Sequence, residues 1–371
     1  MKFSVSSADL LKQLQIVGGA IGSNPVLPIL EDFLFAIDGN TLKIAATDLE
    51  TSISTEMEIQ ASGSGEVAIP ARILLDTLKA LPEQPITFSV DEDNFAISIT
   101  SAYGKYRLAG ENGADFPTIP QPDEVNSVEL PSASLINAIG KTLFATSSDD
   151  LRPAMTGVYF NVGNSELTCV ATDAHKLVKY TYLELESTVS ESFIVPKKAL
   201  NLLKNSLPAN EDVNLSFNRA NAFFSFGSVN LVCRLIDARY PDYNAVIPTE
   251  NPNVLTINRK DFQSSLKRIA IYANKTTNQV VLNISAGSLT VSAQDLDFSN
   301  EATEQLPCSY EGEPLSIGFN AKFLAEMLSI LDTDDVKLEM SNSNRAGILL
   351  PSDQPDGEDI MMLVMPVMLG N

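Results

Sequence analysis

The sequence predicts an α+β fold made of three tandem copies of one domain, each with two helices packed on antiparallel sheets. One segment is written three times and carries its aspartate at Asp48, Asp173 and Asp295. These aspartates lie 125 and 122 residues apart, close to one third of the 371-residue chain. A period of that length is a whole domain, because solenoid units span only roughly 20 to 50 residues.

A second marker keeps the same spacing. It reads Ile69-Pro70-Ala71-Arg72, then Val195-Pro196-Lys197-Lys198, then Gly318-Phe319-Asn320-Ala321-Lys322. Proline-rich linkers lie at residues 116–123 and 241–252. Two markers in one register therefore predict three domains, at residues 1–124, 125–250 and 251–371.

Each copy is expected to begin with an amphipathic helix, at residues 7–21, 132–146 and 259–275. In the first of these, Leu10, Leu14 and Val17 recur at helical spacing. A second helix is expected at 72–81, 197–207 and 320–331. Between the helices, apolar residues alternate with period two, which predicts half-buried strands. The clearest runs are Phe95, Ile97 and Ile99, and Val158, Phe160 and Val162.

Composition indicates a cytoplasmic protein without a membrane span. Hydrophobic residues make up 44% of the chain, but no run of about 18 apolar residues could cross a bilayer. The polar start Lys2 to Ser6 does not fit a secretory signal. Three cysteines without CxxC spacing, Cys169, Cys233 and Cys308, indicate idle thiols with no disulfide framework or zinc site.

The net charge of −22 argues at first against nucleic acid, since phosphate binding needs Lys and Arg. The charges are segregated, however. The six expected helices hold 13 of the 25 basic residues and only 4 of the 47 acidic ones. The basic residues are Lys12, Arg72, Lys79, Lys141, Lys197, Lys198, Lys204, Arg259, Lys260, Lys267, Arg268, Lys275 and Lys322. Basic helix faces are commonly plain solvated surface, but six sharing one bias in an acidic chain favour a common positive surface.

A closed ring with helices inside would bring these faces together. Twelve helices from two chains, spaced about 10 Å apart, enclose an axial diameter of about 38 Å. Removing a helix radius of roughly 5 Å on each side leaves about 28 Å, wide enough for a duplex and a layer of water. The charge pattern therefore fits a ring that surrounds DNA.

Several motifs in this order resemble the bacterial sliding clamp family, the β subunit of DNA polymerase III. They are Leu27-Pro28-Ile29-Leu30, Thr172-Asp173-Ala174-His175-Lys176-Leu177, Ala238-Arg239-Tyr240-Pro241-Asp242-Tyr243 and Met365-Pro366-Val367-Met368-Leu369. The resemblance covers essentially the whole chain. It implies a head-to-tail homodimer of six similar domains that encloses double-stranded DNA and tethers the replicative polymerase. It also implies that the first repeat of one chain pairs strands with the third repeat of the other.

The resemblance also implies three groups of site residues. Near DNA it places Asn24, Arg72, Asp149, Arg152, Pro153, Ala154, Lys197, Lys198 and Lys204. The chain departs from the family at Asn24, where an arginine is often found, and at Pro153-Ala154, where aromatic residues can stand. At the dimer interface it places Tyr106, Leu108, Ile271 and Tyr272.

The third implied group is a hydrophobic cleft for extended peptides of the polymerase, the clamp loader, other polymerases and mismatch-repair proteins. Its residues are Met155, Thr172, Ala174, His175, Lys176, Leu177, Pro241, Val246, Val364, Met365, Pro366, Val367, Met368 and Leu369. An apolar terminus rich in methionine suits varied ligands. The alternative is a last strand folded into the core; both hold if Met365 points inward and its neighbours are exposed.

Other functions fit the residues less well. His175 is the only histidine and has no nucleophile motif beside it, so an enzyme is a distant alternative. Asp48, Asp173 and Asp295 recur once per domain, which favours turns that bind backbone N–H groups over a metal cluster. No cofactor or metal is expected. An acidic scaffold that never binds DNA is the main alternative, although it would not need segregated charge.

Overall fold

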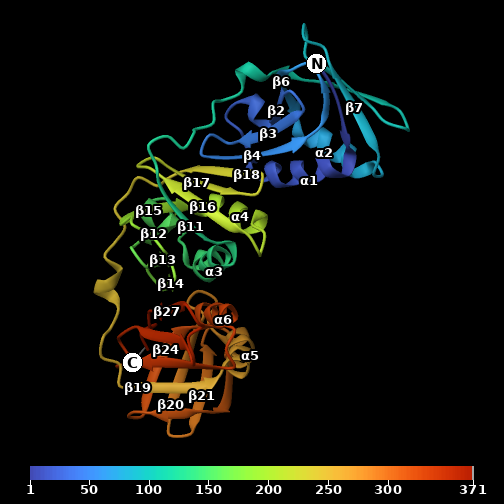
Figure 1. The fold of residues 1–371 in the computed structure, drawn as a ribbon. Helices are drawn as coiled ribbons and strands as arrows, with labels where there is room; N and C mark the ends of the chain where they lie inside the picture. The colour runs from blue at the N-terminus through green and yellow to red at the C-terminus, as the bar shows by residue number, and fades with distance from the viewer. Residues whose placement is uncertain (370–371) are drawn as a thin grey trace. The chain divides into compact units, whose positions relative to one another are not determined.

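The computed structural model describes residues 1–369 of the chain (Figure 1). Two compact units emerge, and each is described by itself. The first unit contains Met1–Ile136 and Lys198–Leu235, and the second contains Asn137–Lys197 and Ile236–Asn371. The middle of the three repeats thus contributes strands to both units. The domain boundaries near 124 and 250 stay a prediction.

The first helix of each repeat is confirmed and ends in a 3₁₀ turn, but a short strand precedes it in every repeat, so the prediction that each repeat begins with the helix was wrong. These helices are α1 (Ser7–Val17), α3 (Ser132–Thr142) and α5 (Arg259–Ile269), continued by η1 (Gly18–Ala20), η4 (Leu143–Ala145) and η7 (Ala270–Tyr272). Ser6 and Asn258 begin α1 and α5 by accepting backbone N–H hydrogen bonds from Asp9 and Asp261. Leu10, Leu14 and Val17 are buried.

The second helix of each repeat is also confirmed. These helices are α2 (Ala71–Ala80), α4 (Lys197–Ser206) and α6 (Ala321–Ile330). Asn320 caps α6 by accepting from the N–H groups of Lys322 and Phe323, at 3.0 and 3.4 Å. α2 lies beside α1, and α6 lies beside α5 (Figure 1).

The first unit holds a nine-stranded and a five-stranded antiparallel sheet. The nine-stranded order is β10 (Glu111–Asn112), β6 (Gly65–Pro70), β2 (Asp32–Asp38), β3 (Thr41–Thr47), β4 (Thr51–Glu58), β18 (Val229–Arg234), β17 (Asn221–Phe226), β16 (Asp212–Phe217) and β11 (Asn126–Pro131). The five-stranded order is β5 (Gln60–Ser62), β1 (Lys2–Ser6), β7 (Pro85–Val90), β8 (Ala96–Thr100) and β9 (Lys105–Ala109). Strands of the first and middle repeats join where β4 pairs with β18, with Thr51 opposite Cys233.

The second unit holds a nine-stranded and a four-stranded antiparallel sheet. The nine-stranded order is β15 (Glu191–Pro196), β12 (Gly157–Val162), β13 (Leu167–Thr172), β14 (Lys176–Tyr182), β27 (Glu358–Val364), β26 (Gly347–Pro351), β25 (Asp335–Met340), β19 (Asn253–Asn258) and β23 (Ser309–Glu311). The four-stranded order is β22 (Asn300–Pro307), β21 (Ser288–Asp295), β20 (Gln279–Ser285) and β24 (Leu315–Asn320). Strands of the middle and third repeats join where β14 pairs with β27, with Lys176 opposite Val364.

The alternating runs were predicted correctly except at one residue. Val158, Phe160 and Val162 are fully buried in β12. Phe95, by contrast, lies before β8 in a left-handed conformation with φ 56°, so its placement in the strand was wrong. Its backbone N–H instead donates to the carbonyl of Asp91 at 2.9 Å and closes a turn.

The cysteines are free thiols, as predicted. Cys169 and Cys233 are buried and Cys308 is half-buried. Burial raises the pKa of the Cys233 thiol to about 12 and raises that of Cys169 further. Both thiols are therefore protonated and unreactive at neutral pH. In residues 1–369 no helix is long and apolar enough to span a membrane.

Candidate functional site

The repeated aspartate closes a turn in each repeat, as the sequence predicts. Asp48 Oδ1 accepts hydrogen bonds from the N–H groups of Glu50 and Thr51, at 3.0 and 2.7 Å. Asp173 Oδ1 accepts from His175 and Lys176, both at 2.9 Å. Asp295 Oδ1 accepts from Asp297 at 3.1 Å. The metal-cluster alternative gains nothing here, since residues 1–369 contain no group of ligands that could hold a metal ion.

The second oxygen of Asp48 binds one of the predicted DNA contacts. Lys198 Nζ donates to Asp48 Oδ2 at 2.5 Å and to the carbonyl oxygen of Ala20 at 3.1 Å. The Asp48 side chain is only 20% exposed. Much of the Lys198 charge is therefore balanced within the first unit, which leaves less for a phosphate.

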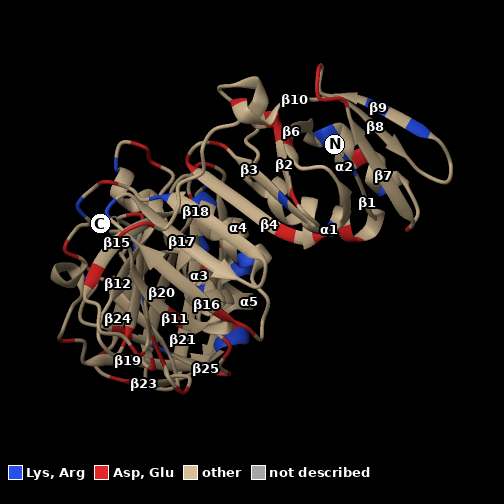
Figure 2. Ribbon diagram, turned by 45° about the horizontal axis from the view of Figure 1, so that its top comes forward, with Lys and Arg blue, Asp and Glu red and all other residues tan. Residues whose placement is uncertain are grey.

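Other predicted DNA contacts remain open to solvent. On α4, Lys197, Asn201 and Lys204 are exposed, whereas Leu200 and Leu203 are buried. Figure 2 shows the basic residues of this helix in blue. Nothing among the ion pairs of residues 1–369 involves Lys197, Lys204 or Arg72. The predicted division of α4 into a polar basic face and an apolar face is confirmed.

Arg72 lines a small pocket of the first unit that contains both acidic and basic side chains. Its pocket has a volume of about 460 Å³ and includes Lys79, Glu31 and Asp32. Asp32 is only 6% exposed, and burial, helped by the neighbouring charges of Glu111 and Glu31, raises its pKa to about 6. Deprotonating this carboxyl at neutral pH therefore costs free energy.

Some helix cations are already paired, so the positive excess is smaller than the sequence count suggests. Lys141 donates to Glu358 Oε2 in the second unit, and both side chains are 12% exposed. Arg268 forms two hydrogen bonds with Glu304, at 2.7 and 2.6 Å. Arg259 donates to two backbone carbonyls, those of Thr333 and Leu328.

The predicted DNA-contacting loop of the second unit carries Asp149, Asp150 and Arg152, so its net charge is −1. Arg152 Nε donates to Asp149 Oδ2 at 2.9 Å, and this hydrogen bond lowers the pKa of Asp149. Pro153 begins the 3₁₀ helix η5 (Pro153–Thr156), and Ala154 packs against apolar residues beneath it. Asn24 is exposed in the first unit. The loop at residues 149–154 therefore offers a duplex no net positive charge.

An apolar cluster lies beside the residues predicted to bind partner peptides. Its buried members are Val170, Leu177, Ile194, Tyr240, Ala346, Ile348 and Leu363. Half-buried Ala154, Tyr159, Ile236, Ala238, Tyr243, Ile247, Leu350 and Met361 pack against it. The rings of Tyr159 and Tyr240 stack at 4.8 Å, and the Tyr240 hydroxyl donates to the carbonyl of Val170. Of the predicted cleft residues, Leu177 belongs to this apolar cluster, whereas Pro241 and Val246 are exposed and Met155 is half-buried.

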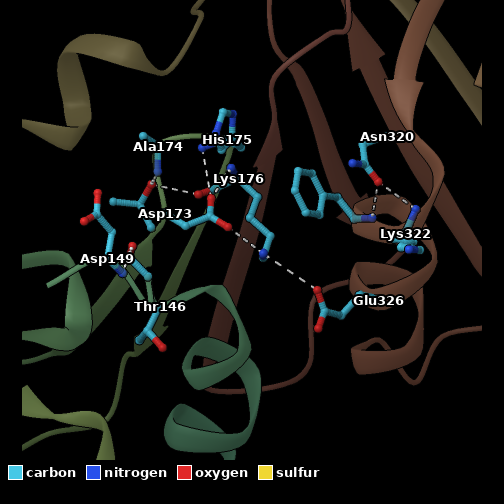
Figure 3. A network of polar contacts seen from close by, with 12 residues as sticks. Thr146, Asp149, Asp173, Ala174, His175, Lys176, Asn320, Lys322 and Glu326 are labelled. Carbon is cyan, nitrogen blue, oxygen red and sulfur yellow. Dashed lines mark hydrogen bonds and ion pairs between the residues drawn. The ribbon is translucent and has the colours of Figure 1, made fainter. Parts of the chain in front are cut away.

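The turn of the middle repeat packs against α6 (Figure 3). The buried Lys176 donates from Nζ to Asp173 Oδ2 at 2.7 Å and lies 3.8 Å from Glu326 Oε2. The same Nζ lies 4.4 Å from the centre of the Phe323 ring, and the His175 ring is 6.3 Å from that ring. Two carboxylates and an aromatic face thus surround one buried ammonium group.

The same turn leaves part of its surface open. Thr172 Oγ1 donates to the Lys176 carbonyl and accepts from the N–H of Ala174. Ala174 has φ 75°, and both Ala174 and His175 are exposed. A ligand can therefore reach Ala174 and His175, whereas Thr172 and Lys176 hold the turn in place.

The last described residues are hydrogen-bonded first to this turn of the middle repeat and then to strand β24 of the third repeat. Val364 is buried at the end of β27. The N–H of Met365 donates to the His175 carbonyl at 2.9 Å, and the N–H of Val367 donates to the Gly318 carbonyl at 2.8 Å. Met365 is 41% and Met368 64% exposed. The condition under which both tail alternatives hold, an inward Met365, is not met: β27 ends at Val364, buried like Met362 and Leu363 before it, and Met365 lies beyond the strand.

The predicted dimer residues lie on an edge strand and in an exposed 3₁₀ helix. Tyr106 and Leu108 are half-buried on β9, the last strand of the five-stranded sheet. Ile271 and Tyr272 are 65% and 43% exposed in η7. Large apolar side chains at such positions are typical of an interface.

Several residues that shape this site were missed from the sequence. Phe323 and Glu326 enclose Lys176, Asp48 binds Lys198, and Glu358 binds Lys141. Only the role of Phe323 could have been inferred from the sequence. The repeat markers make Phe323 equivalent to Ile73 and Ala199, and an aromatic ring at only one of these three positions suggests a contact specific to the third repeat.

Comparison with known proteins gives one consistent result. Models of the N-terminal, central and C-terminal domains of the DNA polymerase III beta subunit match residues 1–120, 129–242 and 244–368. The beta sliding clamps of Synechococcus elongatus and Vibrio cholerae are 31% and 30% identical, and each comparison covers 100% of both chains. Among solved structures, the sliding clamp of Bacillus subtilis superimposes with a TM-score of 0.95 at 25% identity, over 100% of both chains. The Pseudomonas aeruginosa clamp bound to griselimycin gives 0.94 at 28% identity, also over 100% of both chains.

Proposed function

The chain belongs to the DNA polymerase III beta subunit family and is a DNA sliding clamp for the replicative polymerase, and we propose that two copies close head to tail into a ring around duplex DNA. Its three tandem domains follow the clamp fold. Duplex DNA, a second copy and the polymerase are the partners that this family implies.

The strand order of the sheets is the observation that supports ring closure best. Both junctions between successive repeats are nine-stranded sheets, and the two remaining sheets have five and four strands. β9 ends the five-stranded sheet and β22 ends the four-stranded one. Pairing β9 of one chain with β22 of another would complete a third nine-stranded sheet. Such a contact repeats on the opposite side and closes the assembly.

We propose that DNA passes along the basic helix faces, chiefly Arg72, Lys197 and Lys204, with Lys198 contributing less because Asp48 neutralises it. Asn24, Asp149, Arg152, Pro153 and Ala154 would contact the backbone without a large charge contribution. Weak phosphate contacts suffice if enclosure holds the clamp on DNA, and weak contacts allow sliding.

We also propose that extended peptides dock on the apolar cluster and the tail of the second unit. The exposed Met365 and Met368 and the half-buried Tyr243 and Met361 offer adaptable apolar contacts beside backbone groups. Partners would include the polymerase, the clamp loader, other polymerases and mismatch-repair proteins. In this role the chain is a processivity subunit without turnover of its own, and the acidic-scaffold alternative is not favoured.

Primer extension on primed circular single-stranded DNA tests the proposal. With the cognate polymerase and clamp loader, adding this chain should lengthen the products of a single polymerase binding event many-fold. A matched reaction with the chain truncated after Pro366 should give short products. Product lengths that do not change when the full chain is added would refute the assignment.

A further inference from the structure

One loop of the third repeat and one helix of the first repeat expose apolar side chains. The equivalents of this loop and this helix in the other repeats contact each other at a junction between repeats. Leu296 and Phe298, in the loop between β21 and β22, are 79% and 71% exposed. Ile73, in the first turn of α2, is 51% exposed. These apolar side chains are open for contact with another molecule, although exposure alone does not assign them one.

The repeat markers define which positions are equivalent. Strand pairing shows that the loops after the repeated aspartates are equivalent, since Thr47 pairs with Ser52, Thr172 with Leu177 and Gln294 with Glu301. The third loop is two residues longer and carries Phe298. Counting three residues from Pro70, Pro196 and Asn320, Ile73 corresponds to Ala199 and Phe323. The position before it holds a cation in every repeat, as Arg72, Lys198 and Lys322.

At both internal junctions, the aspartate turn of one repeat contacts the first turn of the next repeat's second helix. In the first unit, Asp48 binds Lys198 at the start of α4. In the second unit, the Lys176 ammonium lies 4.4 Å from the centre of the Phe323 ring on α6. The latter contact joins the loop equivalent to the one that carries Phe298 with Phe323, the equivalent of Ile73. The strand that follows each turn also pairs with the next repeat, as β4 with β18 and β14 with β27.

We infer that the Asp295–Ser299 turn of one chain docks on the first turn of α2 in a second copy, with Phe298 packed against Ile73. The inference rests on the proposed head-to-tail ring and adds the side-chain contact that closes it. At the internal junction a lysine faces an aromatic ring, whereas here two apolar side chains meet. Arg72 precedes Ile73 and Asp297 precedes Phe298, so opposite charges flank the apolar pair.

The binding partner of the Asp295–Ser299 turn is a second copy of the chain, because each chain carries this turn once and the first turn of α2 once. The two surfaces are complementary, since each has an exposed apolar side chain beside a charge of opposite sign. Phe298 begins the segment that leads into the edge strand β22, and β9 provides the free edge of the first repeat's sheet. Docking Phe298 on Ile73 would thus be continuous with the proposed pairing of those edges. A large aromatic anchor in a small contact is where interface binding energy concentrates.

A double-mutant cycle on dimer dissociation tests the contact. Phe298→Ala and Ile73→Ala should each raise the dimer Kd by about tenfold or more, and the double variant should do little more than either alone. Leu151→Ala is the matched control, since Leu151 is 90% exposed on another loop and should leave the Kd unchanged. Sedimentation velocity over a dilution series gives the Kd, and thermal unfolding confirms that each variant is folded.

A short bismaleimide provides the second measurement, with Ile73→Cys and Phe298→Cys combined in a Cys308→Ser background. The contact predicts a covalent dimer, while either cysteine alone should give monomers on a denaturing gel. Cys169 and Cys233 are buried and should not react. A wild-type dimer whose Kd is unchanged in both alanine variants, and which does not cross-link, overturns this contact while ring closure stands. A wild-type chain that stays monomeric overturns the proposed ring, and the contact with it.

Discussion

Replacing Lys197 and Lys198 separately by methionine should separate DNA contact from folding. The two residues are adjacent in the sequence, but their surroundings differ. Lys197 is exposed, whereas Lys198 is hydrogen-bonded to Asp48 and to the Ala20 carbonyl. Methionine keeps most of the side-chain length and removes only the charge.

The magnitude follows from the burial of the pair. Lys198 is 40% and Asp48 20% exposed, so their interaction lies between an exposed pair, worth about 0.2 to 1 kcal/mol, and a charged hydrogen bond, worth about 1.5 to 3 kcal/mol. Lys198→Met should therefore cost about 1 to 2 kcal/mol and lower the unfolding midpoint of the first unit by a few degrees, about 2–4 °C per kcal/mol. Lys197→Met should change stability by less than about 0.5 kcal/mol.

Two assays measure these effects. Circular dichroism follows thermal unfolding, since the chain has no tryptophan for fluorescence. Affinity for a labelled duplex across a salt series gives the slope of log K against log salt, which falls by about 0.9 for each lost phosphate contact. Lys197→Met should reduce the slope by about that amount, and Lys198→Met should reduce it less. An unaltered midpoint for Lys198→Met together with an equal slope change in both variants would refute the reasoning.

Three further changes have definite expected outcomes. Glu358→Gln leaves the half-buried Lys141 without its carboxylate and should destabilise the second unit by about 1.5 to 3 kcal/mol, whereas adding Lys141→Met should recover part of the loss; chemical denaturation measures both. Burial raises the pKa of Glu358, but hydrogen bonds from Lys141 and Asn137 outweigh it and leave the pKa below 4.5, so this stabilisation should vanish only as pH falls through that lowered value. Asp32→Asn should raise the free energy of unfolding by up to about 3 kcal/mol at pH 8 but not near pH 3. The wild-type pKa of about 6 exceeds the ordinary 3.8, so wild-type stability declines as pH rises between these values. Unfolding midpoints of wild type and variant that differ equally at both pH values would contradict this. Deleting residues 367–371 removes the Val367 hydrogen bond to Gly318 and should abolish binding of a partner peptide by fluorescence anisotropy while the dimer persists; normal peptide binding would place the docking site elsewhere.

Local periodicity explains why the helices could be predicted. Leu10, Leu14 and Val17, and Leu200 and Leu203, are buried at the spacing that their sequence positions require. The turn role of Asp48 and Asp173 could be predicted for a similar reason, because an aspartate reaches backbone N–H groups only two and three residues ahead.

The errors have tertiary causes. Lys198 lies 150 residues from Asp48, so only the folded chain shows that its charge is balanced. Lys141 meets Glu358 across 217 residues in the same way. At the tail, β27 ends at Val364, which is buried like Met362 and Leu363, and Met365 lies beyond the strand. Pairing between distant segments leaves no local sequence signal.

The inferred contact between Phe298 and Ile73 depends on the internal repeat. Neither residue stands out alone in the sequence, and neither has a polar group that suggests a role. The loop equivalent to the one that carries Phe298 touches Phe323, the equivalent of Ile73, within one unit, and this connects the two residues. Internal repetition therefore predicts contacts between chains from contacts within a chain.

Retention on circular DNA tests the central claim most directly. After loading onto a nicked circle, the protein should stay bound through gel filtration in moderate salt, and linearising the same DNA with a restriction enzyme should release it. Enclosure predicts this difference, since a ring held by weak phosphate contacts slides off free ends. Equal retention on circular and linear DNA would contradict a ring that surrounds the duplex.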